Sequence, residues 1–471
     1  MTPAAGLQSP LTGRASGVLL HPSSLPGPGA TGTLGEAAYR FVDFLAAAGF
    51  GYWQMLPLGP PDRYGSPYQA ASAFAGNPAL LAPDPGSGPE PEPEPEPEFV
   101  DFLDATQHWL DDYALYRVIQ NHHPELDWPQ WPEPLRRRHP DALAAMRREG
   151  AEAYRAVQIE QFRVDRQWRA LRRHAADRGI RLIGDLPLFV AHASADVWSH
   201  PEQFLLDEAG QPLAVAGVPP DYFSATGQWW GNPHYRWETM ACDGFHWWRQ
   251  RLDHLRRQFD LVRFDHFRGL EAYWEIPAGA ASAAAGRWVP GPGSQLLDAL
   301  ARDRSPLPLI AEDLGVITPA VEALRDRYGL PGMKILQFAF DSDARNPYLP
   351  HNHQANAVVY TGTHDNDTTL GWFRRLDTMH RQRVLEYLGL PPDAMPWPLI
   401  RAAFASAARL TIIPMQDLLG LGSARRMNVP GTCGGNNWRF RFAWDEVPGH
   451  LAAHLRELNS RHERAPTAPR P

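Results

Sequence analysis

The chain has 471 residues, of which 44% are hydrophobic and 21% are charged, a composition typical of a folded globular protein. Its formal net charge of -8 and the lack of a dense basic run exclude a general nucleic-acid binder. No run of 18 apolar residues or secretory signal is seen, and two cysteines, Cys242 and Cys433, fit a reducing cytoplasm.

Eight short runs of apolar, β-branched or aromatic residues lie along the chain, and nearly all are followed at once by polar, Gly or Pro residues. These predicted strands cover residues 17–20, 52–56, 180–183, 261–264, 307–311, 333–336, 357–361 and 410–413. Helical periodicity between them includes 36–48, 244–258 and 319–328. Eight strand–loop–helix units predict an α/β fold, a (β/α)8 TIM barrel that takes up residues 1–471 as a single catalytic domain.

Three intervals between predicted strands are too long for ordinary βα units. Residues 62–178 are predicted to be a mostly helical insertion between strands 2 and 3. Within it, a Pro-Glu repeat at 89–98 cannot bury apolar area and is predicted to be an extended, solvated loop. Residues 191–243 after strand 3 and residues 271–303 after strand 4 are predicted to be two further insertions.

The segment 217–233 of the second insertion has little periodicity, several turn formers and three aromatic residues. A loop of this kind is either disordered or a lid that covers a site. Its aromatic content favours a lid on which Tyr222, Trp229 and Trp230 contact a sugar.

Predicted strands 4, 5 and 7 each end in carboxylates: Asp265, Glu312 and the run 364–367. A buried strand that ends in a carboxylate is costly unless that end opens into a site. Three such ends at one side of a parallel barrel indicate an enzyme. Two or three clustered carboxylates point toward glycosidic-bond chemistry.

Asp265 is a candidate nucleophile because Arg263 lies two residues earlier on the same strand, so both side chains face the same way. A neighbouring guanidinium keeps a carboxylate ionised, as nucleophilic attack requires. The alternative is a purely structural Arg–Asp pair. Asp185, near the end of strand 3, either supports Arg263 or the nucleophile, or belongs to a structural turn.

Glu312 directly follows the apolar run Leu309–Ala311, so its carboxyl is partly desolvated. Desolvation raises the pKa of a carboxyl and suits a general acid. Asp313 points the other way by strand alternation. A helix-cap or loop role is the alternative, and it explains Asp313 better than Glu312.

The run His364–Asp367 closes strand 7, and one of its carboxylates could hold substrate hydroxyls. A turn is the bland alternative, because Asp and Asn are common in turns. A Zn or Mg site is a third reading. Since the run at this strand end has no HxH pair and the chain has no CxxC, we predict no metal.

The chain closely resembles the 4-α-glucanotransferases called amylomaltases, or disproportionating enzymes, of the α-amylase clan. The resemblance covers nearly the whole chain, and the order of its motifs makes it specific. The runs that carry it are HPSSLPGPG (21–29), YGSPYQAASAFAGNP (64–78), GDLPLFVA (184–191), GVPPDYFSATGQWWGNP (217–233), RFDHFRG (263–269), AEDLGVITP (311–319), LPGMKILQFAFD (330–341), NPYLPHN (346–352), TGTHDNDTTLGW (361–372) and NW (437–438).

The resemblance implies a retaining mechanism on α-1,4-glucans and maltooligosaccharides, with no catalytic metal and no organic cofactor. Asp265 occupies the nucleophile position, Glu312 the acid/base position and Asp365 the position that stabilises the transition state. The substrate-binding residues that the resemblance implies are Tyr68, Asp185, Trp230, Arg263, His364 and Asn437.

The chain departs from the family pattern in three places. RYG precedes SPYQ where many relatives carry GYGD, Phe264 replaces a more usual Ile or Val, and the Pro-Glu repeat is unexpected. Rival hypotheses are an α-1,4-glucan hydrolase of the same clan, a metal-dependent barrel enzyme and a non-catalytic glucan-binding protein. The sequence leaves acceptor preference, minimum donor length, ring formation and oligomeric state open.

Overall fold

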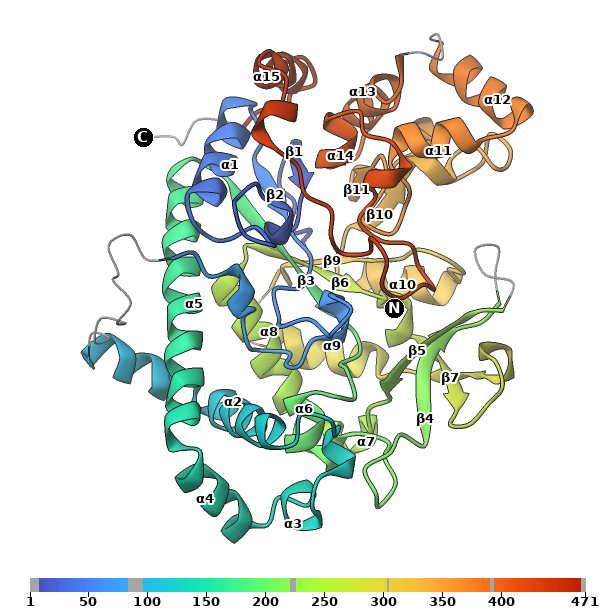
Figure 1. The fold of residues 1–471 in the computed structure, drawn as a ribbon. Coiled ribbons are helices and arrows are strands. Elements are labelled where there is room, and N and C mark those ends of the chain that lie inside the picture. The colour runs from blue at the N-terminus through green and yellow to red at the C-terminus, as the bar shows by residue number, and fades with distance from the viewer. Residues whose placement is uncertain (1–7, 84–95, 221–225, 303–304, 390–393, 467–471) are drawn as a thin grey trace.

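Eight parallel strands close into a barrel at the centre of the molecule (Figure 1). The computed structural model describes residues 8–83, 96–220, 226–302, 305–389 and 394–466. Around the barrel the strands follow the order β1-β12-β11-β10-β9-β6-β3-β2. They are β1 (Ala15–Leu19), β2 (Tyr52–Gln54), β3 (Arg181–Pro187), β6 (Leu261–Asp265), β9 (Leu309–Ala311), β10 (Gly332–Ile335), β11 (Ala357–Tyr360) and β12 (Leu410–Pro414).

The predicted fold class, a (β/α)8 TIM barrel, is confirmed, and each of the eight predicted runs overlaps a barrel strand. β3 continues to Pro187, beyond the predicted end at residue 183, so Asp185 lies within a strand and the turn interpretation of Asp185 is wrong. In the β3–β6 pairing Asp185 stands opposite Arg263. Residues opposite each other on neighbouring parallel strands face the same side of the sheet, so this register places the two side chains together.

The barrel strands are apolar because both faces are buried. All four residues of β11, Ala-Val-Val-Tyr, are buried, and so are all five of β12. Gly17 lets β1 approach its neighbours, since a Cβ there would lie 2.5 Å from the carbonyl oxygen of Tyr52 and 2.8 Å from Ile412. The barrel closes where β1 pairs with β12.

Three helices were expected from apolar spacing, and the structure contains all three: α1 (Glu36–Ala47), α8 (His246–Gln258) and α10 (Pro319–Arg327). α10 begins as predicted, because the Thr318 hydroxyl accepts from the backbone N–H of Val321 and a proline opens the first turn. α8 begins two residues later than predicted, after Phe245, which has a left-handed backbone with φ of 57°.

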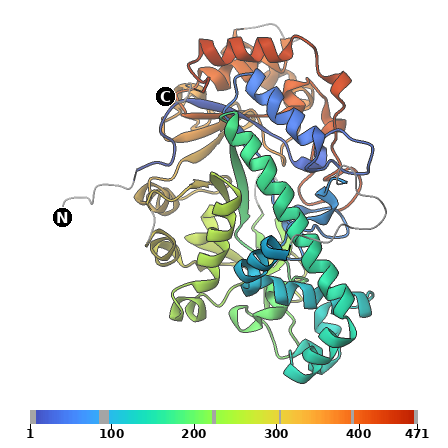
Figure 2. The same cartoon turned by 90° about the vertical axis from the view of Figure 1, so that its left-hand side faces the viewer.

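Between β2 and β3 the chain forms two long helices and two short ones: α2 (Glu96–His122), α3 (Glu133–Arg136), α4 (Pro140–Glu149) and α5 (Ala151–Asp177). α2 packs on α5, which runs from the barrel to the lower lobe in Figure 2. Most of the predicted Pro-Glu loop, residues 89–95, lies outside the described residues. Residues 96–98 form the first turn of α2, so the expectation of an extended loop is wrong there.

A second sheet lies beside the barrel and is antiparallel, with the strand order β5-β4-β7-β8. Its strands are β4 (Ala214–Val218), β5 (Gln228–Pro233), β7 (Ala272–Pro277) and β8 (Arg287–Pro290). β4 and β5 come from the segment 191–243, whereas β7 and β8 come from 271–303. Two segments far apart in the sequence therefore share one sheet, seen at the lower right of Figure 1.

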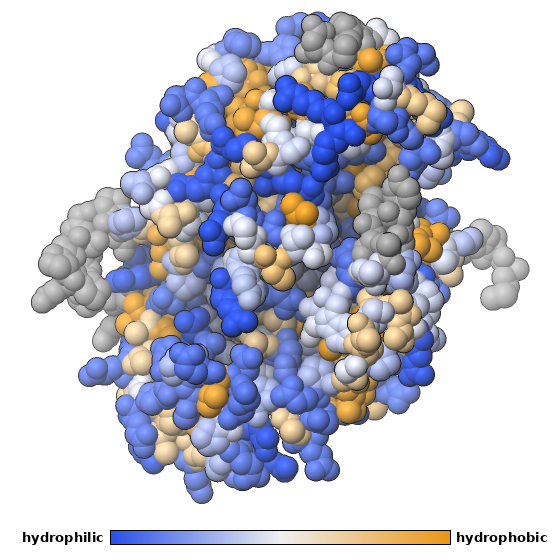
Figure 3. Space-filling view, turned by 45° about the vertical axis from the view of Figure 1, so that its right-hand side comes forward, coloured by the Kyte–Doolittle hydropathy of each residue, from blue (hydrophilic) through white to orange (hydrophobic). Residues whose placement is uncertain are grey.

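Most of the remaining helices lie around the barrel, whereas α6 and α7 lie in the lower lobe near α2 (Figures 1 and 2). They are α6 (Ala195–Ser199), α7 (Trp237–Cys242), α9 (Gly293–Ala301), α11 (Thr369–Arg375), α12 (Thr378–Leu388), α13 (Trp397–Ala405), α14 (Met415–Leu418) and α15 (Leu451–Arg461). Within the described ranges, no helix is both long and apolar enough to cross a membrane. Hydrophilic residues cover most of the face in Figure 3, which is hollowed near its centre.

Candidate active site

Arg263 lies at the centre of the site and binds two carboxylates at once. Its guanidinium donates to Asp185 Oδ2 and to Asp265 Oδ1, each at 2.7 Å. Although burial lowers the pKa of Arg263, the two carboxylates raise it well above its usual value. Arg263 therefore carries a permanent positive charge between Asp185 and Asp265.

The two carboxylates bound by Arg263 differ in their access to solvent. The Asp265 side chain is 25% exposed, whereas the Asp185 side chain is 0% exposed. Asp265 can therefore reach a bound molecule, and Asp185 acts on such a molecule only through Arg263 and Tyr68. This geometry gives Asp185 a supporting position behind Arg263 and Tyr68, and direct contact between Asp185 and a sugar stays a prediction.

Tyr68 joins this ion-pair network to the end of β11. Its hydroxyl donates to Asp185 Oδ2 at 3.0 Å and lies 2.9 Å from His364 Nε2. The Tyr68 and His364 rings stack with centroids 5.3 Å apart and planes 12° apart. Burial, and next the charge of Asp185, raise the pKa of Tyr68 well above its usual value, so its hydroxyl stays protonated.

Asp365 follows His364 and faces the opening of the site. Its side chain is 45% exposed, and its Oδ2 lies 3.4 Å from His364 Nε2. Asn428 donates to Asp365 Oδ1 at 2.7 Å, and Arg426 donates to the Asp365 carbonyl at 2.7 Å. Burial lowers the pKa of His364, while Asp365 raises it in part.

Glu312 begins the loop after β9 and lies beside the end of β6. Its backbone N–H donates to the Phe264 carbonyl at 3.0 Å, which continues the β6–β9 pairing by one residue. Asp265 and Glu312 are therefore the first residues past paired positions on neighbouring strands, which lie ~4.8 Å apart. Burial raises the pKa of Glu312 to about 8; Arg263 opposes this shift and Asp265 adds to it.

Both oxygens of the Glu312 carboxyl are held by the backbone. The N–H of His266 donates to Oε2 at 2.8 Å, and the N–H of Leu314 donates to Oε1 at 3.0 Å. Asp313 points away, as strand alternation predicted, and forms a buried ion pair with Arg325. Its carboxylate also accepts from the Met333 N–H at 2.7 Å, so Asp313 has a structural position.

The predicted lid segment is partly described. Tyr222 lies outside the described residues, whereas Trp229 and Trp230 lie on β5. The expectation of an irregular loop is wrong at both ends of 217–233, where β4 and β5 pair. Trp230 is half-buried and contacts the His266 ring edge to face, with centroids 4.9 Å apart. Trp229 is 44% exposed.

Asn437, the last predicted substrate-binding residue, lies in the loop beside Asp365, and its side chain is held within that loop. Its Oδ1 accepts from the Val429 N–H at 3.0 Å, and its Nδ2 donates to Thr432. The amide therefore shapes the segment that carries Asn428. Direct contact between Asn437 and a sugar stays a prediction.

Sequence reasoning missed three residues of the site: His266, Arg426 and Asn428. Arg426 and Asn428 act on Asp365 from about 60 residues away, with no motif that links them. His266 acts through its backbone N–H, which a side-chain pattern does not indicate. The run RFDHFRG contains His266, but nothing in this run indicates that its backbone N–H binds Glu312.

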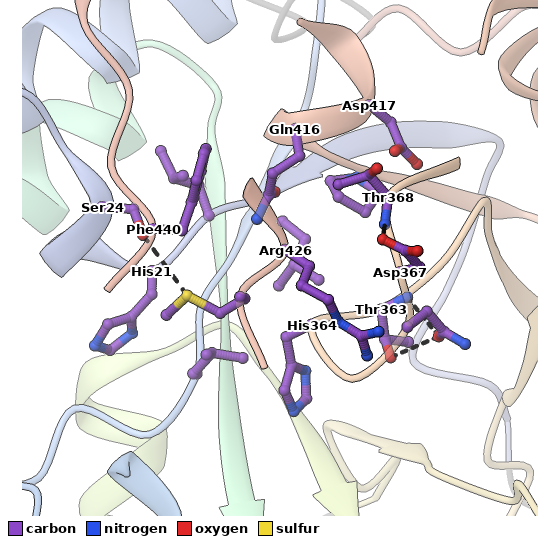
Figure 4. Close-up of a pocket in the computed structure, with 16 residues that line it drawn as sticks. His21, Ser24, Thr363, His364, Asp367, Thr368, Gln416, Asp417, Arg426 and Phe440 are labelled. Carbon is purple, nitrogen blue, oxygen red and sulfur yellow. Dashed lines mark hydrogen bonds between the residues drawn. The ribbon is translucent and has the colours of Figure 1, made fainter. Parts of the chain in front are cut away.

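Two cavities flank the Tyr68–His364 pair. One of about 430 Å³, mouth included, lies between the ends of β1, β11 and β12, with His21 and His364 at its sides (Figure 4). The other, of about 620 Å³, reaches Tyr68 and Asp185 from the side of α8. Among the described residues, no group of three His, Cys, Asp or Glu side chains could hold a metal ion.

Comparison with known proteins gives a consistent result. The family model of glycoside hydrolase family 77, described as 4-alpha-glucanotransferase, matches residues 20–90 and 89–446. A 4-alpha-glucanotransferase of Thermus thermophilus is 46% identical over 500 residues, which cover 96% of this chain and 99% of that protein. One of Synechocystis is 45% identical and covers 94% of this chain and 96% of its own.

A solved structure agrees with these sequence matches. An amylomaltase from Streptococcus agalactiae in complex with acarbose superposes with a TM-score of 0.91 at 35% identity. The match covers 96% of this chain and 100% of that chain.

Proposed function

Since the chain belongs to the 4-alpha-glucanotransferase family, we propose that it moves α-1,4-glucan segments from a donor to an acceptor maltooligosaccharide or glucose. The observation that carries this proposal is the convergence of Asp265, Glu312 and Asp365 at the ends of three barrel strands. Two carboxylates of different exposure and hydrogen bonding beside one glycosidic bond suit a retaining double displacement.

In the first step, Asp265 attacks the anomeric carbon and forms a glucosyl ester. The bond to the leaving oxygen breaks, and that oxygen takes the proton of Glu312. Arg263 supports this division of roles because it donates to Asp265 Oδ1 and holds that side chain in place. The buried, protonated carboxyl of Glu312 is suited to donate near neutral pH.

In the second step, ionised Glu312 takes a proton from an acceptor hydroxyl. The hydroxyl oxygen bonds to the anomeric carbon as the bond to Asp265 breaks, so the enzyme returns to its first state. Asp365 and His364 are proposed to hold hydroxyls of the reacting sugar and to favour its cationic transition state. Tyr68 and Trp230 are proposed to contact the sugars on either side.

The substrate class follows from the family and from one ligand. The amylomaltase from Streptococcus agalactiae was solved with acarbose, and we propose maltooligosaccharides for the corresponding site of this chain. We also propose a cytoplasmic location, because both cysteines are free and exposed, as thiols are in a reducing compartment. Recovery of the protein from the culture medium after cell fractionation would contradict that location.

Incubation of the purified protein with maltotriose tests the function directly. A transferase yields glucose and a ladder of longer maltooligosaccharides, because the covalent glucosyl unit passes to another sugar. A hydrolase yields shorter products only. Chromatography of the products over time separates the two outcomes, and a product mixture without the ladder would refute the proposal.

The Asp265→Asn variant tests the nucleophile. Without a carboxylate at this position no glucosyl ester forms, so turnover should fall at least ~1,000-fold while glucan binding persists. Asp260→Asn is the matched control, since Asp260 lies at the other end of β6, far from the strand ends that carry the site. Normal transfer by Asp265→Asn would overturn the assignment.

A further inference from the structure

His266 follows the proposed nucleophile and has an unusual backbone. Its φ is 54° and its ψ is 46°, in the left-handed region that side chains rarely adopt. Among non-glycine residues, His tolerates this region better than most. In this conformation its N–H points to Glu312 and donates to Oε2 at 2.8 Å. The local backbone of His266 thus fixes one oxygen of the acid/base carboxyl.

The ring of His266 packs against β5, which forms the C-terminal end of the predicted lid segment 217–233 and is called the lid strand below. It meets the Trp230 ring edge to face at 4.9 Å and 87°, and the Phe189 ring lies 6.3 Å away on another side. Burial lowers the pKa of His266 to about 4, so the ring is neutral at the pH of the cell. Its Nε2 is buried with no hydrogen-bond partner among the described residues.

Gly269 makes room for this ring. A Cβ at Gly269 would lie 2.8 Å from His266 Cδ2 and 2.4 Å from Leu188 Cδ2, so the His266 ring and the Leu188 side chain would both have to shift. The ring is therefore confined between Gly269, Phe189 and Trp230. A side chain so enclosed cannot turn aside when Trp230 moves.

We propose that His266 is a positioning residue that couples Trp230 on the lid strand to the acid/base carboxyl of Glu312. The inference rests on the proposed function, in which an acceptor sugar contacts Trp230. An acceptor that stacks on Trp230 holds Trp230 in this edge-to-face contact, which keeps the confined His266 ring in place and so keeps the His266 N–H on Glu312 beside the acceptor hydroxyl. Water, which does not stack on Trp230, gains no such alignment, so the device favours transfer over hydrolysis.

The charge on Glu312 reports on this hydrogen bond. Several other groups also face Glu312 and stay in place in a His266 variant: Arg263 and Asp265 on β6, Asp313 beside it, Tyr348 in the loop after β10 and Tyr360 on β11. The N–H of His266 stabilises the carboxylate form and lowers the pKa of Glu312. Loss of that bond alone raises the pKa, so Glu312 stays protonated to higher pH.

Two variants of His266 test the role of its ring and the role of its backbone separately. His266→Gly removes the ring but keeps the left-handed backbone, which glycine adopts freely. We expect transfer to glucose to fall about 10- to 100-fold, with a raised KM for the acceptor and an unchanged pH profile. His266→Val opposes a left-handed backbone. We expect the alkaline limb of the pH–activity profile of His266→Val to move to higher pH. The kcat of this variant should fall for both transfer and hydrolysis.

A double-mutant cycle tests the coupling itself. Trp230→Leu should lower the ratio of transfer to hydrolysis in the wild-type chain and have little further effect in His266→Gly. Glu463 is the matched control, because it is exposed, far from the site, and left-handed with φ of 55°. Glu463→Val should lower the melting temperature and leave the pH profile unchanged.

The outcomes distinguish this inference from the proposed function. If the wild-type chain makes no ladder from maltotriose, the proposed function itself fails. If the ladder forms but the effects of Trp230→Leu and His266→Gly are additive, only the coupling is refuted. A His266→Val variant with an unshifted alkaline limb would refute the backbone part.

Discussion

Glu312 illustrates how a functional residue carries a cost in stability. It is buried, and its carboxyl is held by two backbone N–H groups that prefer the ionised form. Burial nevertheless prevails and raises the pKa to about 8, far above that of an exposed Glu. The folded protein therefore keeps a proton on Glu312 that the unfolded chain releases near pH 4.5.

The sign of the resulting pH dependence follows from proton counts. Between about pH 4.5 and 8 the folded state binds the proton and the unfolded state does not, so this residue lowers stability as pH rises. Glu312→Gln removes the titration. The variant should be inactive, yet gain stability over the wild type by on the order of a few kcal/mol at pH 8 and little at pH 5.

Urea denaturation at both pH values measures the effect. Glu322→Gln, an exposed change on α10, is the control and should leave the free energy of unfolding unchanged at both pH values. If Glu312→Gln changed the free energy of unfolding by the same amount at pH 5 and pH 8, the explanation from burial would be contradicted.

At the scale of residues, the sequence indicated which side chains belong to the site better than it indicated which groups they contact. Asp265 and Glu312 were found because each ends an apolar run, and a carboxylate in that place has a large desolvation cost. Asp185 was considered as part of a turn, but β3 extends past it and its side chain is buried beside Arg263. Arg426 and Asn428 act on Asp365 only after the chain folds back, so spacing along the sequence gave no signal.

At the scale of elements, the second sheet links β5, which carries Trp229 and Trp230, to the rest of the molecule. Gly217 on β4 stands opposite Trp229 on β5 and Trp274 on β7. A Cβ at Gly217 would lie 2.2 Å from the carbonyl oxygen of Gln228 and 2.6 Å from Ile276. Only glycine lets β4 pass between β5 and β7 at this point.

Gly217→Ala should therefore separate β4 from β5 and displace Trp230, the next residue but one after Gln228 on that strand. We expect the ratio of transfer to hydrolysis to fall several-fold and stability to fall by about 1–3 kcal/mol, the usual cost of overpacking. Product analysis and thermal denaturation measure the two effects. Leu213→Ala, an exposed change just before β4, is the control, and an unchanged product ratio in Gly217→Ala would contradict the argument.

The barrel strands were predictable and the second sheet was not, for one physical reason. Barrel strands are buried on both faces, so each is a continuous apolar run that stands out from its surroundings. β5 and β8 are partly exposed and contain Gly, Asn, Arg and Pro. The pairing of β4 with β7 joins two segments more than 40 residues apart, and no local pattern in the sequence indicates such a pairing.

At the scale of the whole molecule, residues near the two ends of the described chain stabilise the junction of β1 and β12, where the barrel closes. Arg464 is fully buried beyond α15, and its guanidinium donates to the carbonyls of Ala15, Phe404, Ser406, Ala408 and Arg409. These carbonyls flank the junction of β1 and β12. One side chain thus satisfies five acceptors where the first and last strands meet.

Arg464→Met should remove this donor from the carbonyls of Ala15 and Ala408, whereas Phe404 and Ser406 still accept from Arg14, and Arg409 still accepts from the Ala15 N–H. We expect a loss of about 2–4 kcal/mol of stability, since each unsatisfied buried acceptor costs about 1 kcal/mol or more. Arg461→Met, an exposed change on α15, is the control and should stay within about 0.5 kcal/mol of the wild type. Equal melting temperatures of the two variants would contradict this role.

Closure by β12 has a consequence for synthesis on the ribosome. The strand contributes none of the carboxylates, yet the ring around them is complete only when it inserts between β1 and β11. A nascent chain that stops before residue 410 already contains Asp265, Glu312 and Asp365, but its barrel is still open between β1 and β11. Premature termination late in translation should therefore release a catalytically silent fragment, a safeguard against stray glucan scrambling by unfinished copies.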